Sequence, residues 1–520
     1  MFSSARYRWR HRAAPRVLYL AAPLSAFFPL GRVQPALGFP PINRLSLVIA
    51  FSRQFLSTLL ALCGVAAAGG LGCDHSRPLP TPPPPSPAFG AAHPGAPEAG
   101  PGVGEQAQWR PRGLWVLAEG SQRVLEDPAR LSPLLETATR LGVSDLFVQV
   151  YRGGRSWYAS DLADASPYRA LIEATGVDTL KALIAGAHAR GIRVHAWVNV
   201  FSLSLNPEAP ILQKLGRDAV LVDRSGRNLL DYPNFEIPAP DGDWYRMGTR
   251  GIYLDPGAPG VEEILTATFV ELVLRYPALD GLHLDYVRHP GALPFVPGSR
   301  FGVGLDFGYG MPSRVRFGQE TGLSGPYRNR ENPSPSALVN ANAWDHWRRE
   351  KVTQVVASIA TEARAARPGL AISAAVISYA DRAYLSLSQD WPLWLEEGWI
   401  DLAIPMVYTL DDRLLRYQLE RFGRAVERQR IWSGLGVWLF ARSPERAVRQ
   451  IEIARAAGLE GDVLFSYDAI ADAPELEAAL ADAFAGAGLD DDGFAEGAEG
   501  AEVAEDAEGA SPSPPAMEEP

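Results

Sequence analysis

Short apolar runs alternate with longer amphipathic stretches through the middle of this chain, from about residue 112 to residue 484. Apolar runs of four to eight residues are typical of buried strands, and apolar positions repeating every three or four residues are typical of helices. The pattern predicts eight strands, over Gly113–Ala118, Asp145–Val150, Arg193–Val200, the start of Leu279–Pro290, Leu370–Ile377, Leu402–Tyr408, Ile431–Val437 and Asp462–Tyr467. It predicts helices after them over Pro128–Leu141, Val177–Arg190, Gly260–Tyr276, Ala343–Ala366, Trp391–Glu397, Asp411–Arg428, Ser443–Ala457 and Pro474–Phe484.

Eight successive strand–helix pairs favour a closed barrel over an open sheet. We therefore expect an α/β fold, a (β/α)8 TIM barrel over residues 106–486. Two long irregular stretches interrupt the alternation, one after the third strand up to Gly251 and one from Arg288 to about Asn340. These stretches are predicted to be loop insertions after strands three and four.

The amino-terminal region has the composition of an export signal. Arg53 precedes an apolar run, Phe55–Gly72, which ends at Cys73. A basic flank followed by an apolar core and small residues describes such a signal, and this one resembles a bacterial lipoprotein signal. The other cysteine, Cys63, would be removed by cleavage before Cys73, so the remaining thiol suits lipidation. We expect residues 1–73 to be an extension with this signal, and the protein to be lipid-anchored at Cys73 in the cell envelope, facing the periplasm or the exterior.

The segments that flank the predicted barrel lack the apolar content of a core. Residues 74–105 are rich in Pro, Ala and Gly and predict a semi-rigid linker. The tail, residues 487–520, is acidic and is expected to be disordered. Its eleven acidic residues and absence of basic ones account for the net charge of −11. The rest of the chain is close to neutral, which argues against nucleic acid as a partner.

The stretch Leu279–Pro290 carries the first candidate for catalysis. Alternation along a strand places Leu282 and Leu284 on one face and His283 and Asp285 on the other. In a barrel the second face points to the axis, with Asp285 nearest the carboxyl end of the strand, where catalytic residues of such barrels lie. The alternative for Asp285 is a structural role as a hydrogen-bonded aspartate. The alternative for His283 and His195 is a role as hydrogen-bonded histidines of the core.

Polar and aromatic residues at other strand ends predict a sugar-binding mouth. Gln149 and Asn199 are expected to lie near Asp285, where amide and carboxylate groups together bind several hydroxyls. Sugar faces stack on aromatic rings. The aromatics at strand ends and in the next loops are Tyr151, Trp157, Tyr158, Tyr286, Tyr379, Tyr408, Trp438 and Tyr467. The predicted substrate-binding residues are Gln149, Arg152, Trp197, Asn199, Tyr286, Arg288, Tyr379, Tyr408 and Trp438.

Arg288 follows the fourth strand and is predicted to hydrogen-bond sugar hydroxyls or a lactyl carboxylate. The alternative is a salt bridge within the second insertion.

Several segments together resemble the bacterial glycosyl-hydrolase-like 10 family of exported lipoproteins. The residues that carry the resemblance are Arg-Gly-Leu-Trp at 112–115, Phe-Val-Gln-Val at 147–150, His-Ala-Arg-Gly-Ile-Arg-Val-His-Ala-Trp-Val-Asn at 188–199, Leu-Asp-Pro-Gly at 254–257, Asp-Gly-Leu-His-Leu-Asp-Tyr-Val-Arg-His-Pro at 280–290 and Asp-Leu-Ala-Ile-Pro-Met-Val-Tyr at 401–408. The resemblance implies a barrel glycosidase that needs no cofactor. For some members it implies peptidoglycan glycan strands without stem peptides as the substrate.

Glycosidases usually use two carboxyl groups, and Asp285 supplies only one. Many family members have two consecutive aspartates where this chain has Asp285-Tyr286. Candidates for the second group are Asp468 after the eighth strand, Asp381 after the fifth, and Glu320 in the second insertion; Asp468 is taken with Asp285 as the catalytic pair.

Two other functions compete with a polysaccharide-cleaving hydrolase. One is a catalytically inactive barrel that binds glycan through its aromatic residues. The other is a metal-dependent deacetylase that uses His283, Asp285 and His289, which is disfavoured because His283 lies one layer below Asp285 and Pro290 ends the strand. No metal is therefore expected, and the sequence identifies no protein partner.

Overall fold

The computed structural model describes residues 110–294, 305–327, 338–425 and 430–486. These residues all belong to one of the two compact units of the chain, Asp74–Pro520. The predicted signal with Cys73, the linker and the acidic tail lie outside the described residues. Within the described ranges, the helices are too short or too polar to cross a membrane.

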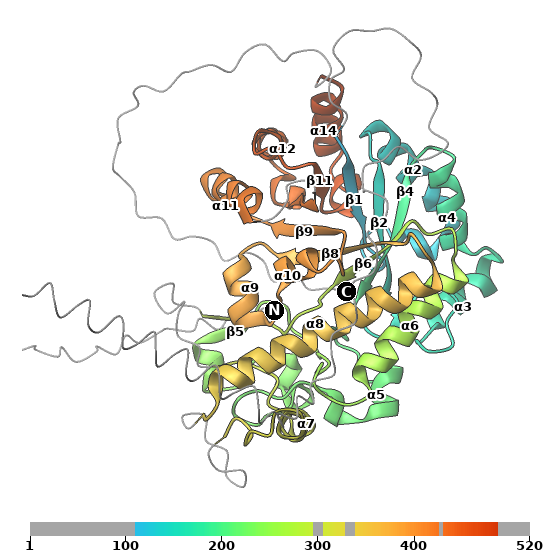
Figure 1. The fold of residues 1–520 in the computed structure, drawn as a ribbon. Coiled ribbons are helices and arrows are strands. Elements are labelled where there is room, and N and C mark those ends of the chain that lie inside the picture. Colours follow the sequence, from blue (N-terminus) through green and yellow to red (C-terminus); the bar gives the residue numbers. More distant parts are fainter. Residues whose placement is uncertain (1–109, 295–304, 328–337, 426–429, 487–520) are drawn as a thin grey trace, which may run out of the picture. The chain divides into compact units, whose positions relative to one another are not determined.

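Eight parallel strands form a closed barrel, which confirms the predicted fold (Figure 1). Each strand pairs with the next in sequence, and the first strand, β1, also pairs with the last, β11, which closes the sheet. The barrel strands are β1 (Arg112–Val116), β2 (Asp145–Arg152), β4 (Arg193–Asn199), β6 (Gly281–Asp285), β8 (Ala371–Ile377), β9 (Leu402–Val407), β10 (Trp432–Leu435) and β11 (Gly461–Leu464). A short strand, β3 (Arg155–Ser156), runs antiparallel to the end of β2.

Helices surround the strands, as Figure 1 shows. They are α2 (Leu131–Arg140), α3 (Ser166–Thr175), α4 (Thr179–His188), α5 (Pro210–Leu215), α6 (Val261–Arg275), α7 (Met311–Thr321), α8 (Ala341–Ala366), α9 (Ala380–Leu387), α10 (Trp391–Glu396), α11 (Asp412–Ala425), α12 (Pro444–Ala456), α13 (Tyr467–Ala471) and α14 (Pro474–Gly486). Short 3-10 turns are η1 (Val124–Glu126), η2 (Pro128–Arg130), η3 (Arg217–Ala219), η4 (Leu229–Asp231), η5 (Pro233–Phe235), η6 (Asp241–Asp243) and η9 (Val437–Phe440). The sequence pattern did not predict α3, which lies in a stretch expected to be a loop, or α5 and α7, which lie in the two predicted insertions. It also did not predict α9, between the fifth strand and α10.

The apolar side chains form two separate cores because successive residues of a strand point to opposite faces. Leu146, Val148 and Leu284 belong to the large core between the barrel and the helices. Phe147 and Trp197 belong to a smaller core inside the barrel. The alternation in β2, β4 and β6 thus points polar side chains as well as the rings of the smaller core toward the barrel axis. The predicted site residues Gln149, Asn199 and Asp285 are among these polar side chains.

A β-bulge near the end of β2 changes which face its last residues occupy. Gln149 pairs with Trp197 of β4, but Tyr151 pairs with the very next residue, Val198. The extra residue in β2 turns Tyr151 outward. Its ring packs edge-on against Phe269 of α6, with ring centroids 5.2 Å apart. The prediction that Tyr151 lies at the sugar-binding mouth is therefore wrong.

The two predicted insertions pack against each other beside the barrel. β5 (Tyr245–Met247) of the first pairs with β7 (Ala292–Pro294) of the second in a two-stranded antiparallel sheet. The hydroxyl of Tyr327 in the second insertion donates to the carbonyl of Arg224 in the first at 2.7 Å. Together they form one structured side of the barrel.

Candidate active site

Asp285 is the last residue of β6 and lies at the carboxyl end of the barrel. Its Oδ2 accepts a hydrogen bond from the indole N–H of Trp197 at 3.1 Å, and its Oδ1 accepts one from the backbone N–H of Tyr286 at 2.6 Å. Burial raises the pKa of Asp285 to about 6, against the opposing effects of the Arg288 charge and these two donors. A carboxyl group with this pKa is suited to donate a proton near neutral pH.

The residue after Asp285 has an uncommon backbone conformation. Tyr286 has a φ of 50°, in the left-handed region that residues with a Cβ rarely adopt. Its N–H donates to the Asp285 carboxyl group. Strained backbone of this kind clusters at functional sites, so the geometry of Tyr286 is consistent with a site built around Asp285.

Polar side chains from neighbouring strands lie next to Asp285, as predicted. Asn199 pairs with Asp285 in the sheet register. The Gln149 amide donates to Asn199 Oδ1 at 3.3 Å, and Gln149 Oε1 accepts from the Ala118 backbone at 3.3 Å. The inward faces of β2, β4 and β6 thus bring two amides and one carboxyl group together at the mouth. Their roles in binding sugar stay predictions.

A cavity of about 330 Å³ opens between the ends of β6, β8 and β9. Asp285 is not among its lining residues, but its charge acts on two residues that are, Arg288 and Tyr408. Arg288, Tyr379 and Tyr408 line it. Asp285 contributes to the raised pKa of Tyr408, behind the larger effect of burial, so the two groups are close. The Tyr408 hydroxyl is buried, and among the described residues it has no hydrogen-bond partner.

Only some of the predicted aromatic residues are exposed at the mouth. Tyr379 and Trp438 are 41% and 37% exposed. Trp157, Tyr158 and Tyr467 are buried in the outer core with Tyr151, so their predicted place at the mouth is wrong. The Tyr158 ring packs against Tyr276, which follows α6, with ring centroids 6.2 Å apart. Apolar burial of this kind stabilises the fold. The residue that instead fills the centre of the mouth is Phe465, which contacts the rings of Trp115, Trp197 and Tyr408.

Arg152 lies at the end of β2 in an ion pair that the sequence did not reveal. Its Nη1 is 3.3 Å from Glu119, and Nη2 of Arg155 is 2.9 Å from the other carboxylate oxygen of Glu119. Glu119 follows β1 by three residues and is only 12% exposed. It is a further carboxylate at the carboxyl ends of the strands, and its position just beyond a short strand was the only signal for it.

The three candidates for a second carboxyl group lie in different environments. Glu320 is bound by Arg316, Lys351 and the indole N–H of Trp347, which makes it a structural residue of the second insertion. Asp381 is exposed in the first turn of α9. Asp468 is buried near the end of β11.

Asp468 is held by the loop after β1. Its Oδ1 accepts from the backbone N–H of Gln122 at 2.8 Å, whereas Oδ2 is buried without a hydrogen-bond partner among the described residues. Burial raises the pKa of Asp468. The strand order places β11 across the barrel from β6. The Asp468 carboxyl group is therefore not in contact with Asp285 but belongs to the same end of the barrel.

His283 is a core histidine. The Trp115 indole N–H donates to its Nε2 at 3.1 Å, so Nδ1 carries the proton and donates to Ser373 Oγ at 2.9 Å. Burial lowers the pKa of His283 well below its usual value. Both ring nitrogens are occupied, which argues against the metal triad with Asp285 and His289. Among the described residues there is no group of three His, Cys, Asp or Glu side chains placed to hold a metal ion.

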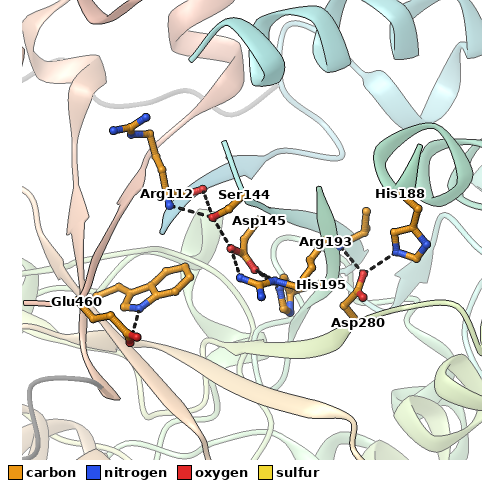
Figure 2. A network of polar contacts seen from close by, with 10 residues as sticks. Arg112, Ser144, Asp145, His188, Arg193, His195, Asp280 and Glu460 are labelled. Carbon is orange, nitrogen blue, oxygen red and sulfur yellow. Dashed lines mark hydrogen bonds and ion pairs between the residues drawn. The ribbon is translucent and has the colours of Figure 1, made fainter. Parts of the chain in front are cut away.

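A second polar cluster lies at the opposite, amino-terminal end of the strands (Figure 2). The Arg193 guanidinium binds both oxygens of Asp145 at 2.7 Å, and His195 lies 2.8 Å from Oδ1. Burial opposes ionisation of Asp145, but the hydrogen bonds from His195 and Arg193 hold its pKa well below the usual value. Nearby, Asp280 accepts from the Val194 backbone and contacts His188. The cluster joins the starts of β2, β4 and β6, where barrel residues serve stability.

Three similarities to known proteins bear on this site. The family described as "Glycosyl hydrolase-like 10" matches residues 110–425. Glycosyl hydrolase DigH of Escherichia coli (strain K12) is 23% identical over 316 residues, which cover 58% of this chain and 62% of that protein. Glycosyl hydrolase YngK of Bacillus subtilis (strain 168) is 25% identical over 302 residues, 55% of this chain and 50% of that protein. The chain thus matches between half and two thirds of the length of these relatives.

One solved structure has the same fold over nearly its whole length. The glycoside hydrolase domain of PgaB (BpsB) from Bordetella bronchiseptica superposes with a TM-score of 0.50 at 15% identity. The match covers 72% of this chain and 99% of that domain. At this sequence identity the similarity is one of fold.

Proposed function

Because this chain belongs to the glycosyl hydrolase-like 10 family, we propose that it is a glycoside hydrolase that cleaves O-glycosidic bonds of a polysaccharide. The reaction takes place at the carboxyl end of the barrel, and Asp285 is the general acid. No cofactor takes part in the proposed reaction.

The observation that carries the proposal is the environment of Asp285. It is the last residue of an inner strand face, it is buried, and its pKa is raised to about 6 mainly by burial. The Trp197 indole donates to one carboxyl oxygen and the Tyr286 backbone N–H to the other, so the orientation of the carboxyl group is defined. Positioned proton donors of this kind contribute roughly a hundredfold to ten-thousandfold to rate.

In the proposed reaction, protonated Asp285 donates its proton to the glycosidic oxygen as the bond to the anomeric carbon breaks. The amides of Gln149 and Asn199 hold hydroxyl groups of the sugar. Tyr286, Tyr379 and Trp438 offer ring faces for stacking. A second carboxylate must either attack the anomeric carbon or take a proton from the attacking water.

We assign the second carboxylate to Asp468. It lies at the same end of the barrel, and its Oδ2 has no hydrogen-bond partner among the described residues. Gly120 leaves room for it: a Cβ at that position would lie 2.1 Å from Asp468 Oδ1. An unpartnered buried carboxylate oxygen costs stability, which function at this position would explain.

A glycan-binding barrel without catalytic activity is the second candidate. One observation favours it. Besides burial, the pKa of Asp285 is shifted by Arg288, Tyr286 and Trp197, and none of these is the second carboxyl group that a glycosidase needs. The two functions differ in turnover and not in glycan binding.

For the substrate and location, we propose peptidoglycan glycan strands without stem peptides and a lipid anchor at Cys73 in the cell envelope. The support for the anchor is the sequence of residues 55–105, an apolar run ending in cysteine and followed by a Pro-rich linker. The proposed substrate follows from the resemblance to the glycosyl-hydrolase-like 10 family. Incubating the purified protein with a panel of glycans, peptide-free peptidoglycan strands among them, and identifying products by mass spectrometry tests the activity. Release of saccharides from one glycan supports it, and intact glycans throughout the panel favour the binding protein.

A further inference from the structure

The cavity between the ends of β6, β8 and β9 has an unusual charge. Among the described residues that line it, Arg288 and Arg382 carry a full charge and none is acidic. Tyr379, Tyr408 and Gln418 add ring faces and an amide. A cavity of about 330 Å³ is at the lower end of the range for small-ligand sites, and it is large enough for a single sugar unit.

Arg288 is buried and has few polar contacts in the described part of the chain. It is 8% exposed, and its Nη1 donates to the carbonyl of the next residue, His289, at 3.3 Å. Its guanidinium also lies 5.0 Å from the Tyr286 ring centroid. Among the described residues no carboxylate forms an ion pair with it, and its Nε has no hydrogen-bond partner. The sequence-based alternative, a salt bridge within the insertion, is thus not found in the described part of the chain.

Other buried arginines of this protein have stronger partners. Arg152, Arg348 and Arg364 each pair with a carboxylate at 3.3 Å or closer. Arg349 donates to the carbonyl of Tyr384 at 2.7 Å. The acidic group known to act on Arg288 is Asp285, through charge, and no described carboxylate forms an ion pair with Arg288. A buried charge without a close counter-charge is costly, so this guanidinium is suited to bind an anion from solution.

Arg382 supplies a second cation from another element. It belongs to the first turn of α9, and its side chain is exposed and makes no hydrogen bond or ion pair with a described residue. Arg288 and Arg382 therefore line the same cavity, and both have N–H groups without a partner among the described residues. A planar carboxylate is the group that guanidinium donors bind in two-point geometry.

We propose that this cavity is a subsite for a carboxylated sugar, whose carboxylate pairs with Arg288 and Arg382 while its ring lies against Tyr408. The inference rests on the proposed glycosidase function, since it places the acidic unit of the substrate next to Asp285. It makes the preferred substrate an acidic glycan and makes Arg382 a specificity-determining residue. The carboxylate can belong to a lactyl ether or to a uronic acid.

The test is binding of matched acidic and neutral sugars to the full chain by titration calorimetry. The pairs are N-acetylmuramic acid with N-acetylglucosamine, and glucuronic acid with glucose. Because Arg382 is exposed, Arg382→Gln is the primary variant, and Arg416→Gln, which removes an exposed arginine of α11 outside the cavity lining, is its matched control. Arg288→Gln is the second variant, with its melting temperature measured first.

The expected result is that at least one acidic sugar binds more tightly than its neutral partner. Arg382→Gln is expected to weaken the binding of that acidic sugar by about tenfold and to leave the affinity for the neutral sugar unchanged. Arg416→Gln should change neither affinity. The acidic sugar that binds identifies the source of the carboxylate. Equal affinity for acidic and neutral sugars, or equal loss in Arg382→Gln and Arg416→Gln, would overturn the subsite. Since these single sugars contain no bond to cleave, the result is independent of hydrolysis: selective binding without turnover of any glycan would reject the enzyme and keep the subsite.

Discussion

The indole N–H of Trp197 in β4 points to the carboxyl group of Asp285 in β6, with 3.1 Å between nitrogen and Oδ2. The two residues lie in adjacent strands, two register positions apart, since Trp197 pairs with His283 and Asp285 pairs with Asn199. A donor to a carboxylate favours the charged form, whereas burial favours the neutral form. Burial dominates here, so Asp285 has a pKa of about 6.

Trp197→Phe removes this donor and keeps a ring in its place. We expect the pKa of Asp285 to rise further, because the charged form loses a hydrogen bond. In the pH profile of kcat/KM, the limb at high pH should therefore shift to higher pH by roughly one unit or less. Trp115→Phe, which removes an indole donor to His283 in the same inner core, is the control and should leave the limb in place. A limb that does not move in Trp197→Phe would show that Asp285 is not the titrating acid.

Asp285 also affects how stability depends on pH. Its pKa is about 6 in the fold against an ordinary 3.8, so the folded state binds the proton more tightly than the unfolded state. The resulting stability is fully present below about pH 4 and is lost as the pH rises through about 6. This contribution to the free energy of unfolding is at most about 3 kcal/mol.

Asp285→Asn is therefore expected to melt at a higher temperature than the natural protein at about pH 8 and at nearly the same temperature at about pH 4. Thermal denaturation at the two pH values measures this. Asp381→Asn, at an exposed position, is the control. Equal melting temperatures of Asp285→Asn and the natural protein at the higher pH would mean that the Asp285 carboxylate is not penalised by burial.

Much of the fold could be predicted from the sequence. In β6 the leucines at 282 and 284 alternate with His283 and Asp285, and this period of two is what places Asp285 on the inner face. The same alternation predicted that Gln149 and Asn199 lie together. It failed at Tyr151, because a bulge adds one residue that no local pattern reveals.

Contacts between distant segments account for the other errors. Trp157 and Tyr158 follow a strand, as site residues do, but they are buried by packing against parts of the chain that their own segment does not identify. Glu119 was missed for a similar reason, since its importance comes from Arg152 and Arg155 in another strand–loop unit.

Asp468→Asn tests the second carboxylate. We expect kcat to fall by roughly a hundredfold or more with a small change in KM, because the lost group acts on the reacting atoms. Asp472→Asn is the matched control, since Asp472 is exposed and contacts the side chains of Ser121 and Gln122 in the same loop. If Asp468→Asn keeps its turnover while Glu119→Gln loses it, the second carboxylate is Glu119.

Cys73→Ser tests the proposed anchor. A thioether-linked lipid requires the thiol, so the variant is expected to move from the membrane fraction to the soluble fraction when expressed in a bacterial host. Cys63→Ser changes the other cysteine of the chain and is the control. Cys73→Ser that stays with membranes as the natural protein does would reject lipidation at this residue.

The most direct test of the central claim is the turnover of Asp285→Asn on the glycan that the natural protein cleaves. Asparagine keeps the size of the side chain and cannot donate the proton, so we expect turnover to fall by roughly a hundredfold or more. Circular dichroism and glycan binding should remain those of the natural protein. Near-normal turnover in a folded Asp285→Asn variant would contradict the assignment of Asp285 as the catalytic acid.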